Sequence, residues 1–100
     1  MTDDFLHMAY FVYITTNPSK AALYIGVTND LARRLAQHYG NRGAPETFAG
    51  RYFCYNLLYS EQFADINGAI AREKELKGWT RAKKEALIAT VNPEWEFLVV

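Results

Sequence analysis

Residues 9–39 read AYFVYITTNPSKAALYIGVTNDLARRLAQHY, and most of the fold follows from them. Residues 9–16 are β-branched and aromatic, which is typical of a strand buried on both faces. Residues 17–20 (NPSK) are turn formers, and residues 22–27 (ALYIGV) read as a second strand. The two strands predict a β-hairpin.

Side chains of the second strand alternate between two faces of the predicted sheet. One face takes three apolar residues, Leu23, Ile25 and Val27. The other face takes Tyr24 and Gly26, and we expect Tyr13 of the first strand to share it.

A helix is predicted over residues 29–39, because Thr28, Asn29 or Asp30 can cap its N-terminus. Its buried stripe is expected to consist of Leu31, Leu35 and Tyr39, at i, i+4 and i+8. Arg34 and His38 are also four residues apart, so both are expected to point along the edge of the sheet.

The rest of the chain predicts a loop, a strand and two helices. The loop covers residues 40–50, the strand residues 52–60, and the helices about residues 65–78 and 81–91, with Asn92-Pro93 as the stop. We therefore predict an α+β fold with a small, mainly antiparallel three-stranded sheet flanked by about three helices.

One acidic residue interrupts the apolar face of the helix over residues 65–78. At about 100° per residue, Glu73 falls within the apolar arc, whereas Glu75 falls almost opposite. The arc consists of Ile66, Ala69, Ile70 and Leu76. A carboxylate aimed at a core costs free energy unless something compensates it. Glu73 is thus either a ligand of a hard cation or the partner of Arg34 or another base.

Composition indicates one domain of 100 residues, with the motif-bearing part at about residues 9–95. The lone cysteine, Cys54, lies in an apolar run and is expected in the core, and it fits a reducing compartment. No apolar run approaches the roughly 20 residues of a membrane span. Asp3 and Asp4 do not resemble the basic start of a signal peptide, so we expect a cytoplasmic protein.

Net charge is zero, which argues weakly against a strong nonspecific nucleic-acid binder. Basic residues are nevertheless concentrated, since ten of the eleven lie between Arg33 and Lys84 against five acidic residues. The densest cluster is Arg72, Lys74, Lys77, Arg81, Lys83 and Lys84. It is either a solvated helix face or a patch that follows phosphates.

Four further residues each have a structural and a chemical interpretation. Tyr13 and Tyr24 are amphipathic core residues, or phenols whose pKa is lowered by a metal or Arg⁺ so that one activates water. Arg34 covers apolar surface with its stem or clamps a phosphate. His38 is a satisfied residue at the helix edge or transfers a proton.

The ordered set of these residues resembles the GIY-YIG nuclease domain over residues 9–95. It is most similar to small stand-alone members related to the amino-terminal nuclease domain of the excision-repair incision subunit. The segments that carry the resemblance are YFVYI, ALYIGVTNDLARRLAQH, LLYSEQF, AIAREKELKGWTRAKKEALI and NPEW. The chain departs from the pattern at Phe11 and Val12 of the first motif, and at Val27, where the repair branch has lysine.

The resemblance implies a site. Tyr13 closes the first motif, Tyr24 and Gly26 match the second, and Arg34 matches the arginine that contacts the scissile phosphate. His38 stands where relatives have histidine or tyrosine, and Glu73 matches the glutamate that binds one divalent metal, Mg²⁺ or Mn²⁺. Further substrate-binding candidates are Arg33, Lys74, Lys77, Arg81, Lys83, Lys84 and the late asparagine Asn92.

The function expected from this resemblance is metal-dependent hydrolysis of DNA phosphodiester bonds, on branched or duplex DNA, with a separate DNA-binding or repair protein as a candidate partner. Two alternatives stay open. The chain is a catalytically weak nucleic-acid-binding or DNA-repair accessory module with the same fold, or it is a structural protein with a vestigial motif.

Overall fold

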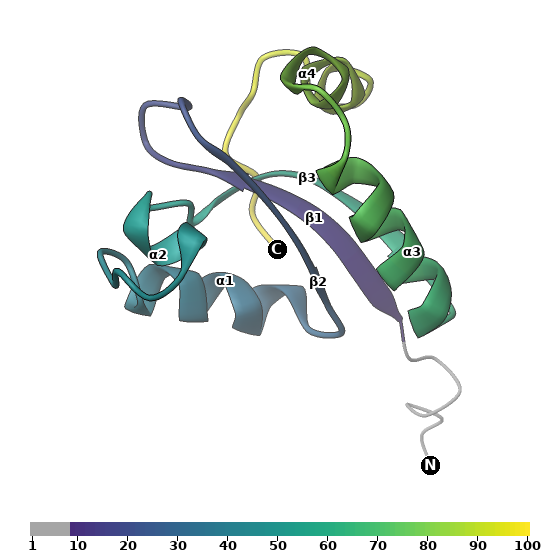
Figure 1. Ribbon diagram of the computed structural model, residues 1–100, viewed down its shortest axis with the longest axis horizontal. Coiled ribbons are helices and arrows are strands. Elements are labelled where there is room, and N and C mark those ends of the chain that lie inside the picture. The colour runs from purple at the N-terminus through teal and green to yellow at the C-terminus, as the bar shows by residue number, and fades with distance from the viewer. Residues whose placement is uncertain (1–8) are drawn as a thin grey trace.

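The computed structural model describes residues 9–100, so Asp3 and Asp4 of the signal-peptide argument lie outside the described residues. Within this range the chain forms three strands and four helices (Figure 1). They are β1 (Tyr10–Thr16), β2 (Leu23–Thr28), α1 (Leu31–Gly40), α2 (Phe48–Arg51), β3 (Asn56–Phe63), α3 (Ile66–Lys77) and α4 (Arg81–Ala89). The predicted α+β class is confirmed.

The sheet has the order β2-β1-β3, and both pairings are antiparallel. β1 lies in the centre and is buried from Val12 to Thr16, as predicted for a strand covered on both faces. In the hairpin, Tyr13 pairs with Gly26 and Ile14 with Ile25. Among the described residues 9–100, β2 lies at one edge of the sheet.

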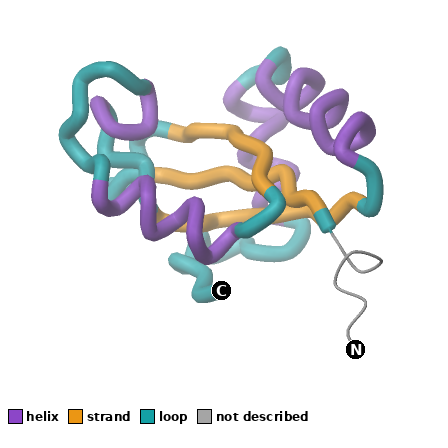
Figure 2. Tube along the Cα trace, turned by 90° about the horizontal axis from the view of Figure 1, so that it is seen from below, coloured by secondary structure: helices purple, strands orange, loops and turns teal. Residues whose placement is uncertain are grey.

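Helices cover both faces of the sheet (Figure 2). On one face, α3 and α4 bury an aliphatic core that contains Val12, Ile14, Ile25, Leu58, Ala69, Leu76 and Ile88. On the other face, Leu31 and Leu35 of α1 pack on a smaller cluster formed by Phe11, Tyr13, Tyr24 and Leu57. The predicted division of β2 is therefore confirmed: Tyr24 and Gly26 share a face with Tyr13.

The buried stripe of α1 is one turn shorter than predicted. Tyr39 is 51% exposed, and its ring lies 5.0 Å from that of Tyr55, edge to face, with the Arg42 guanidinium 3.8 Å from its centre. The last turn of α1 therefore lies beside the segment before β3, where Tyr39 packs on Tyr55.

The segment between α1 and β3 also differs from the prediction. Thr47 caps the single helical turn α2 by accepting a hydrogen bond from the Gly50 amide, so the predicted loop over residues 40–50 contains a helix. The predicted strand over residues 52–60 was wrong at both ends, since β3 runs from Asn56 to Phe63. The late start has a local reason: Phe53 has a left-handed backbone (φ 59°), which interrupts an extended strand. β3 starts at Asn56.

Two simpler expectations agree with the described residues. Cys54 is fully buried, and burial raises the pKa of its thiol to about 11, so it is a core residue and no nucleophile. None of the helices within residues 9–100 has the length and apolar character that a membrane crossing needs.

Candidate active site

The close approach of β1 and β2 at Tyr13 and Gly26 creates the floor of the candidate site. The Tyr13 side chain is fully buried and lies directly over Gly26, its partner in the hairpin. A Cβ atom at position 26 would overlap the hydroxyl and ring of Tyr13. Gly26 is therefore required by the space that the tyrosine ring occupies.

Tyr13, Tyr24 and His38 form one aromatic cluster. The Tyr13 hydroxyl lies 2.8 Å from Nε2 of His38, within hydrogen-bonding distance. The Tyr24 ring lies 6.2 Å from the Tyr13 ring and 5.3 Å from the imidazole, in an edge contact. The hairpin supplies both phenols, and α1 supplies the imidazole.

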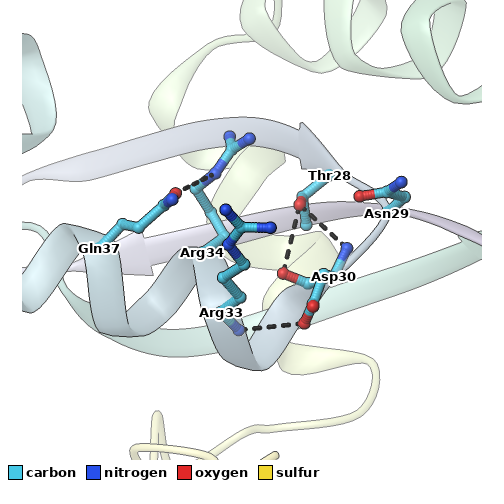
Figure 3. Close-up of a pocket in the computed structure, with 6 residues that line it drawn as sticks. All are labelled: Thr28, Asn29, Asp30, Arg33, Arg34 and Gln37. Atoms are coloured by element: carbon cyan, nitrogen blue, oxygen red, sulfur yellow. Dashed lines mark hydrogen bonds between the residues drawn. The ribbon is translucent and has the colours of Figure 1, made fainter.

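The start of α1 positions the side chains of Arg34 and His38. The Asp30 carboxylate caps the helix by accepting a hydrogen bond from the Arg33 amide at 3.1 Å, and Thr28 Oγ1 accepts one from the Asp30 amide (Figure 3). One helical turn further on, the Arg34 guanidinium donates to Gln37 Oε1 at 3.2 Å and to the Val27 carbonyl at 3.3 Å. The cap thus fixes the direction in which Arg34 and His38 leave the helix.

Burial controls the protonation of the cluster. The pKa of Tyr13 is raised to about 12, first by burial and then by the negative charge that Tyr24 or Glu73 would carry, whereas Arg34 opposes the rise. Of the two interpretations of Tyr13, this direction agrees with the buried core residue, because loss of hydration outweighs the guanidinium. Burial, and then the Arg34 charge, lowers the pKa of His38 below 6.5. At pH 7 the phenol is protonated and the imidazole is neutral.

Glu73 lies on α3, and its side chain is largely buried. Its side chain is 17% exposed. Its Oε2 forms an ion pair with the ammonium group of Lys77, one turn along α3, at 3.2 Å. The carboxylate is also close enough to raise the pKa of Tyr13. Most of the side chain is therefore shielded from bulk water, and the carboxylate is already paired with a cation.

The donor set around Glu73 suits only one kind of metal site. Within residues 9–100, no three His, Cys, Asp or Glu side chains gather as a metal cage. Mg²⁺ and Mn²⁺ are nevertheless commonly held by one or two carboxylates, with water and phosphate oxygens completing the shell. One inward-facing carboxylate that attracts an ammonium fits a hard cation of this class.

Several predicted substrate-binding cations line cavities beside the cluster. Arg33 shares a cavity of about 250 Å³ with Arg34 and Gln37 on the outer side of α1 (Figure 3). Lys77 and Lys84 line a second cavity of about 310 Å³ along the edge of β2. Lys74 is exposed on α3.

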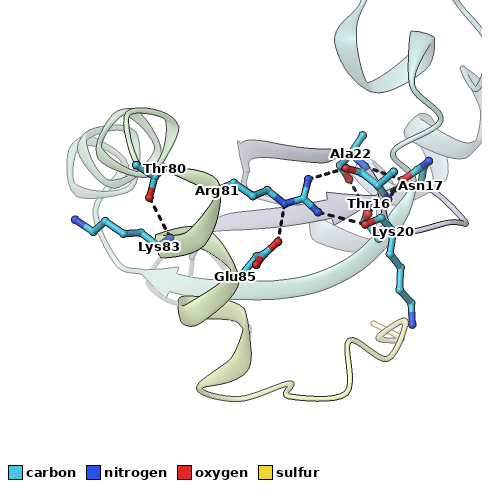
Figure 4. A network of polar contacts seen from close by, with 9 residues as sticks. Thr16, Asn17, Lys20, Ala22, Thr80, Arg81, Lys83 and Glu85 are labelled. Carbon is cyan, nitrogen blue, oxygen red and sulfur yellow. Dashed lines mark hydrogen bonds and ion pairs between the residues drawn. The ribbon is translucent and has the colours of Figure 1, made fainter.

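Arg81 is engaged in contacts within the protein. Its guanidinium donates to Glu85 at 2.9 Å, to the Ala21 carbonyl at 2.6 Å and to the Lys20 carbonyl at 3.3 Å (Figure 4). These bonds tie α4 to the turn of the hairpin. Lys83 lies 4.5 Å over the Trp79 ring. The geometry thus gives Arg81 an anchoring contact and Lys83 a contact with an aromatic ring, and substrate binding by either residue stays a prediction.

Asn92 is likewise an anchor. It is buried, and its Nδ2 donates to the carbonyls of Leu58 and Glu96, both at 2.9 Å, while its Oδ1 accepts from the Glu96 amide at 3.0 Å. Both amide hydrogens are used within the protein. The side chain therefore holds the C-terminal segment against β3.

Two residues beside the site were missed in the sequence. Gln37 stands three residues after Arg34, and this spacing could have identified it as the partner of the guanidinium. Phe48 lies within the segment predicted as loop, yet its ring lies 6.3 Å from that of Tyr24. No pattern in the sequence predicts that contact, because α2 folds back toward β2 through tertiary packing.

A model of the GIY-YIG catalytic domain matches residues 9–86 of the chain. A UPF0213 protein of Bacillus pumilus is 38% identical over 90 residues, which cover 90% of this chain and 88% of that protein. A UPF0213 protein of Natronomonas pharaonis is 38% identical over 80 residues, 80% of this chain and 91% of the relative. These relatives span almost the same length as this chain.

A solved structure is similar as well. The solution NMR structure of a UPF0213 protein from Bacillus halodurans is 31% identical to this chain, with a TM-score of 0.55, and the match covers 89% of this chain and 92% of that one. Sequence and fold therefore agree on the relationship.

Proposed function

This chain belongs to the GIY-YIG catalytic domain family, and from that membership and the site geometry we propose that it is a metal-dependent endonuclease that hydrolyses DNA phosphodiester bonds. The observation that carries the proposal is the 2.8 Å contact between the Tyr13 hydroxyl and Nε2 of His38. It joins a protonated phenol to a neutral imidazole inside one aromatic cluster.

The pair suggests a two-step proton path. With the imidazole proton on Nδ1, the Tyr13 hydroxyl donates to the free Nε2 of His38. As the attacking water forms its bond to phosphorus, its proton passes to Tyr13, and the phenol proton passes to His38. The tyrosine never has to exist as a free phenolate, so its raised pKa is no obstacle.

Arg34 and Glu73 complete the proposed chemistry. The Arg34 guanidinium would bind the scissile phosphate and stabilise the charge that develops on it. Glu73 would hold one Mg²⁺ or Mn²⁺, which supplies positive charge at the phosphoryl and leaving oxygens when bound. Tyr24 packs against the imidazole at 5.3 Å and keeps it aimed at Tyr13.

A cleavage assay with two glutamate variants tests the proposal. Wild type, Glu73→Gln and Glu75→Gln are incubated with branched, single-stranded and duplex DNA and with Mg²⁺ or Mn²⁺. Glu75 lies on the same helix but is 54% exposed and paired with Arg72, so it is the matched control. We expect cleavage by wild type and Glu75→Gln only, with unchanged folding of all three. Undiminished cleavage by Glu73→Gln would overturn the assignment.

The alternative of a binding module without activity is favoured by one observation, the ion pair of Glu73 with Lys77. A carboxylate already neutralised by a lysine has less reason to recruit a metal. Metal-independent DNA binding without nicking in the same assay would support this second function.

A further inference from the structure

A cavity of about 310 Å³ runs along the free edge of β2, next to the candidate active site. We call it the edge groove, and its lining residues are Leu23, Tyr24, Ile25, Phe48, Lys77 and Lys84. β2 contributes the floor, α2 contributes one wall, and the end of α3 and the start of α4 contribute the other. Of these lining residues, only Tyr24 has a role in the proposed hydrolysis.

An exposed aromatic ring forms the α2 wall. Phe48 is 49% exposed although it is large and apolar. Its ring is nearly parallel to that of Tyr24, at 23° and 6.3 Å, and it touches the ring of Tyr52 at 4.7 Å. Neighbouring rings thus hold Phe48 in place while half of its surface stays open, which is the arrangement of a stacking platform.

Two ammonium groups form the opposite wall. Lys77 is partly neutralised by Glu73 at 3.2 Å. Lys84 forms no ion pair with any residue in the described range 9–100, so its charge is available to a ligand. A groove with an aromatic ring on one side and an uncompensated cation on the other fits a ligand with a flat apolar face and a negative charge.

We infer that the edge groove binds one nucleotide of the substrate strand, with its base stacked on Phe48 and its phosphate at Lys84. Base–aromatic stacking together with phosphate contacts is the general basis of nucleic-acid binding without sequence preference. Tyr24 belongs both to the groove and to the cluster with Tyr13 and His38. The bound nucleotide is therefore a near neighbour of the scissile phosphate, and in this respect the inference rests on the proposed function.

The test measures binding without cleavage. In the Glu73→Gln background, the dissociation constant of a fluorescein-labelled single-stranded oligonucleotide is measured without divalent ions, for Phe48→Ala, Phe48→Trp and the control Phe97→Ala. Phe97 is 43% exposed and lies under Lys20, away from the groove. We expect roughly tenfold weaker binding for Phe48→Ala, the effect of losing one stacked base. Phe48→Trp should restore binding, and Phe97→Ala should not change it.

Two further measurements locate the base and the phosphate. In a set of oligonucleotides, each lacks the base at one position. At one of these positions, loss of the base should weaken binding to the protein that keeps Phe48 but not to Phe48→Ala. Lys84→Gln should reduce the slope of log K against log salt by about one, whereas Lys20→Gln should leave it unchanged.

The outcomes separate this inference from the proposed function. Suppose that wild type cleaves DNA, but that Phe48→Ala and Phe97→Ala bind the oligonucleotide equally or that no abasic position weakens binding. This result would overturn nucleotide binding in the edge groove alone, and the groove would then be a candidate surface for a protein partner. Phe48-dependent binding without any cleavage overturns the nuclease and keeps the groove. If the protein neither binds the oligonucleotide nor cleaves DNA, both the nuclease proposal and nucleotide binding in the edge groove are overturned.

Discussion

Tyr13 and Tyr59 lie on neighbouring strands, both are buried, and the pKa of each is raised to about 12, first of all by burial. Their partners differ. The Tyr59 hydroxyl donates to Glu61 Oε2 at 2.6 Å, and Arg72 donates to both oxygens of that carboxylate at 2.9 Å. The Tyr13 hydroxyl meets a neutral imidazole instead.

The comparison shows that a shifted pKa does not by itself identify a reactive group. Burial raises the pKa of Glu61, but the hydrogen bonds from Arg72 and Tyr59 outweigh it and hold that pKa below its usual value. The carboxylate is therefore a poor proton acceptor, and the Tyr59–Glu61–Arg72 network ties β3 to α3. The neutral imidazole of His38 accepts the Tyr13 hydroxyl at Nε2, so the Tyr13 pair can move a proton.

The largest difference should come from removing each hydroxyl. Tyr13→Phe deletes the proton path, and we expect cleavage to fall by about 10²–10⁴-fold, the usual contribution of a positioned acid or base. Tyr59→Phe should leave the cleavage rate within about threefold, since its hydroxyl only serves the ion pair, and should cost roughly 1 kcal/mol of stability. Single-turnover cleavage and urea unfolding of both variants measure this. Equal losses of activity would show that the two tyrosines are not distinct in function.

The space around Tyr13 provides a second contrast. Gly26→Ala places a methyl group against the Tyr13 ring, and we expect it to destabilise the fold by about 1–3 kcal/mol, as overpacking does, and to displace the hydroxyl from His38. Gly40→Ala is the control, because a Cβ there meets no atom within 4 Å. Thermal unfolding and cleavage rates report both effects. Full activity of Gly26→Ala would mean that the position of the phenol is not critical.

The two carboxylates should separate stability from metal binding. Glu61→Gln breaks a partly buried ion pair and is expected to cost about 1–3 kcal/mol, whereas Glu73→Gln breaks an ion pair with the half-exposed Lys77 and should cost less than about 1 kcal/mol. Mn²⁺ should raise the Tm of wild type and Glu61→Gln but not of Glu73→Gln, because only a ligand of the folded state stabilises it. A rise in Tm with Glu73→Gln would place the ion elsewhere.

The smallest expected effect is the pH dependence of stability. The pKa of His38 is lowered in the folded state, so the unfolded chain binds more protons and stability should fall as the pH drops below 6.5 toward the folded pKa. The pKa of Glu61 is also lowered, and its contribution is lost below pH 4.5. Urea unfolding at a series of pH values measures both effects. The loss of stability below pH 6.5 should be absent in His38→Gln, and the loss below pH 4.5 should be absent in Glu61→Gln. If both variants altered the same part of the stability–pH curve, the Tyr13–His38 pair and the Tyr59–Glu61–Arg72 network would not be independent.

Local patterns predicted the hairpin and α1 closely. The strand predicted over residues 22–27 is Leu23–Thr28, and the helix predicted over 29–39 is Leu31–Gly40. Turn formers, caps and alternation all act between near neighbours in the chain, so the sequence contains them in full. The start of β3 was predicted wrongly for the opposite reason. Residues 52–55 have the aromatic character of a strand, but Phe53 has a left-handed backbone, which follows from how the chain packs after α2.

The sequence by itself determined which side chains share a face: Tyr13, Tyr24 and Gly26 on one side of the hairpin, and Arg34 with His38 on one side of α1. Periodicity decides such relations, because it depends only on the local backbone.

Only the tertiary structure decided the protonation of Tyr13, the anchoring tasks of Arg81 and Asn92, and the edge groove. These properties come from contacts across 25 residues for Tyr13 and His38, 34 for Asn92 and Leu58, and 60 for Arg81 and Ala21. Burial and polar partners are set by packing between distant segments, and no local pattern contains that information.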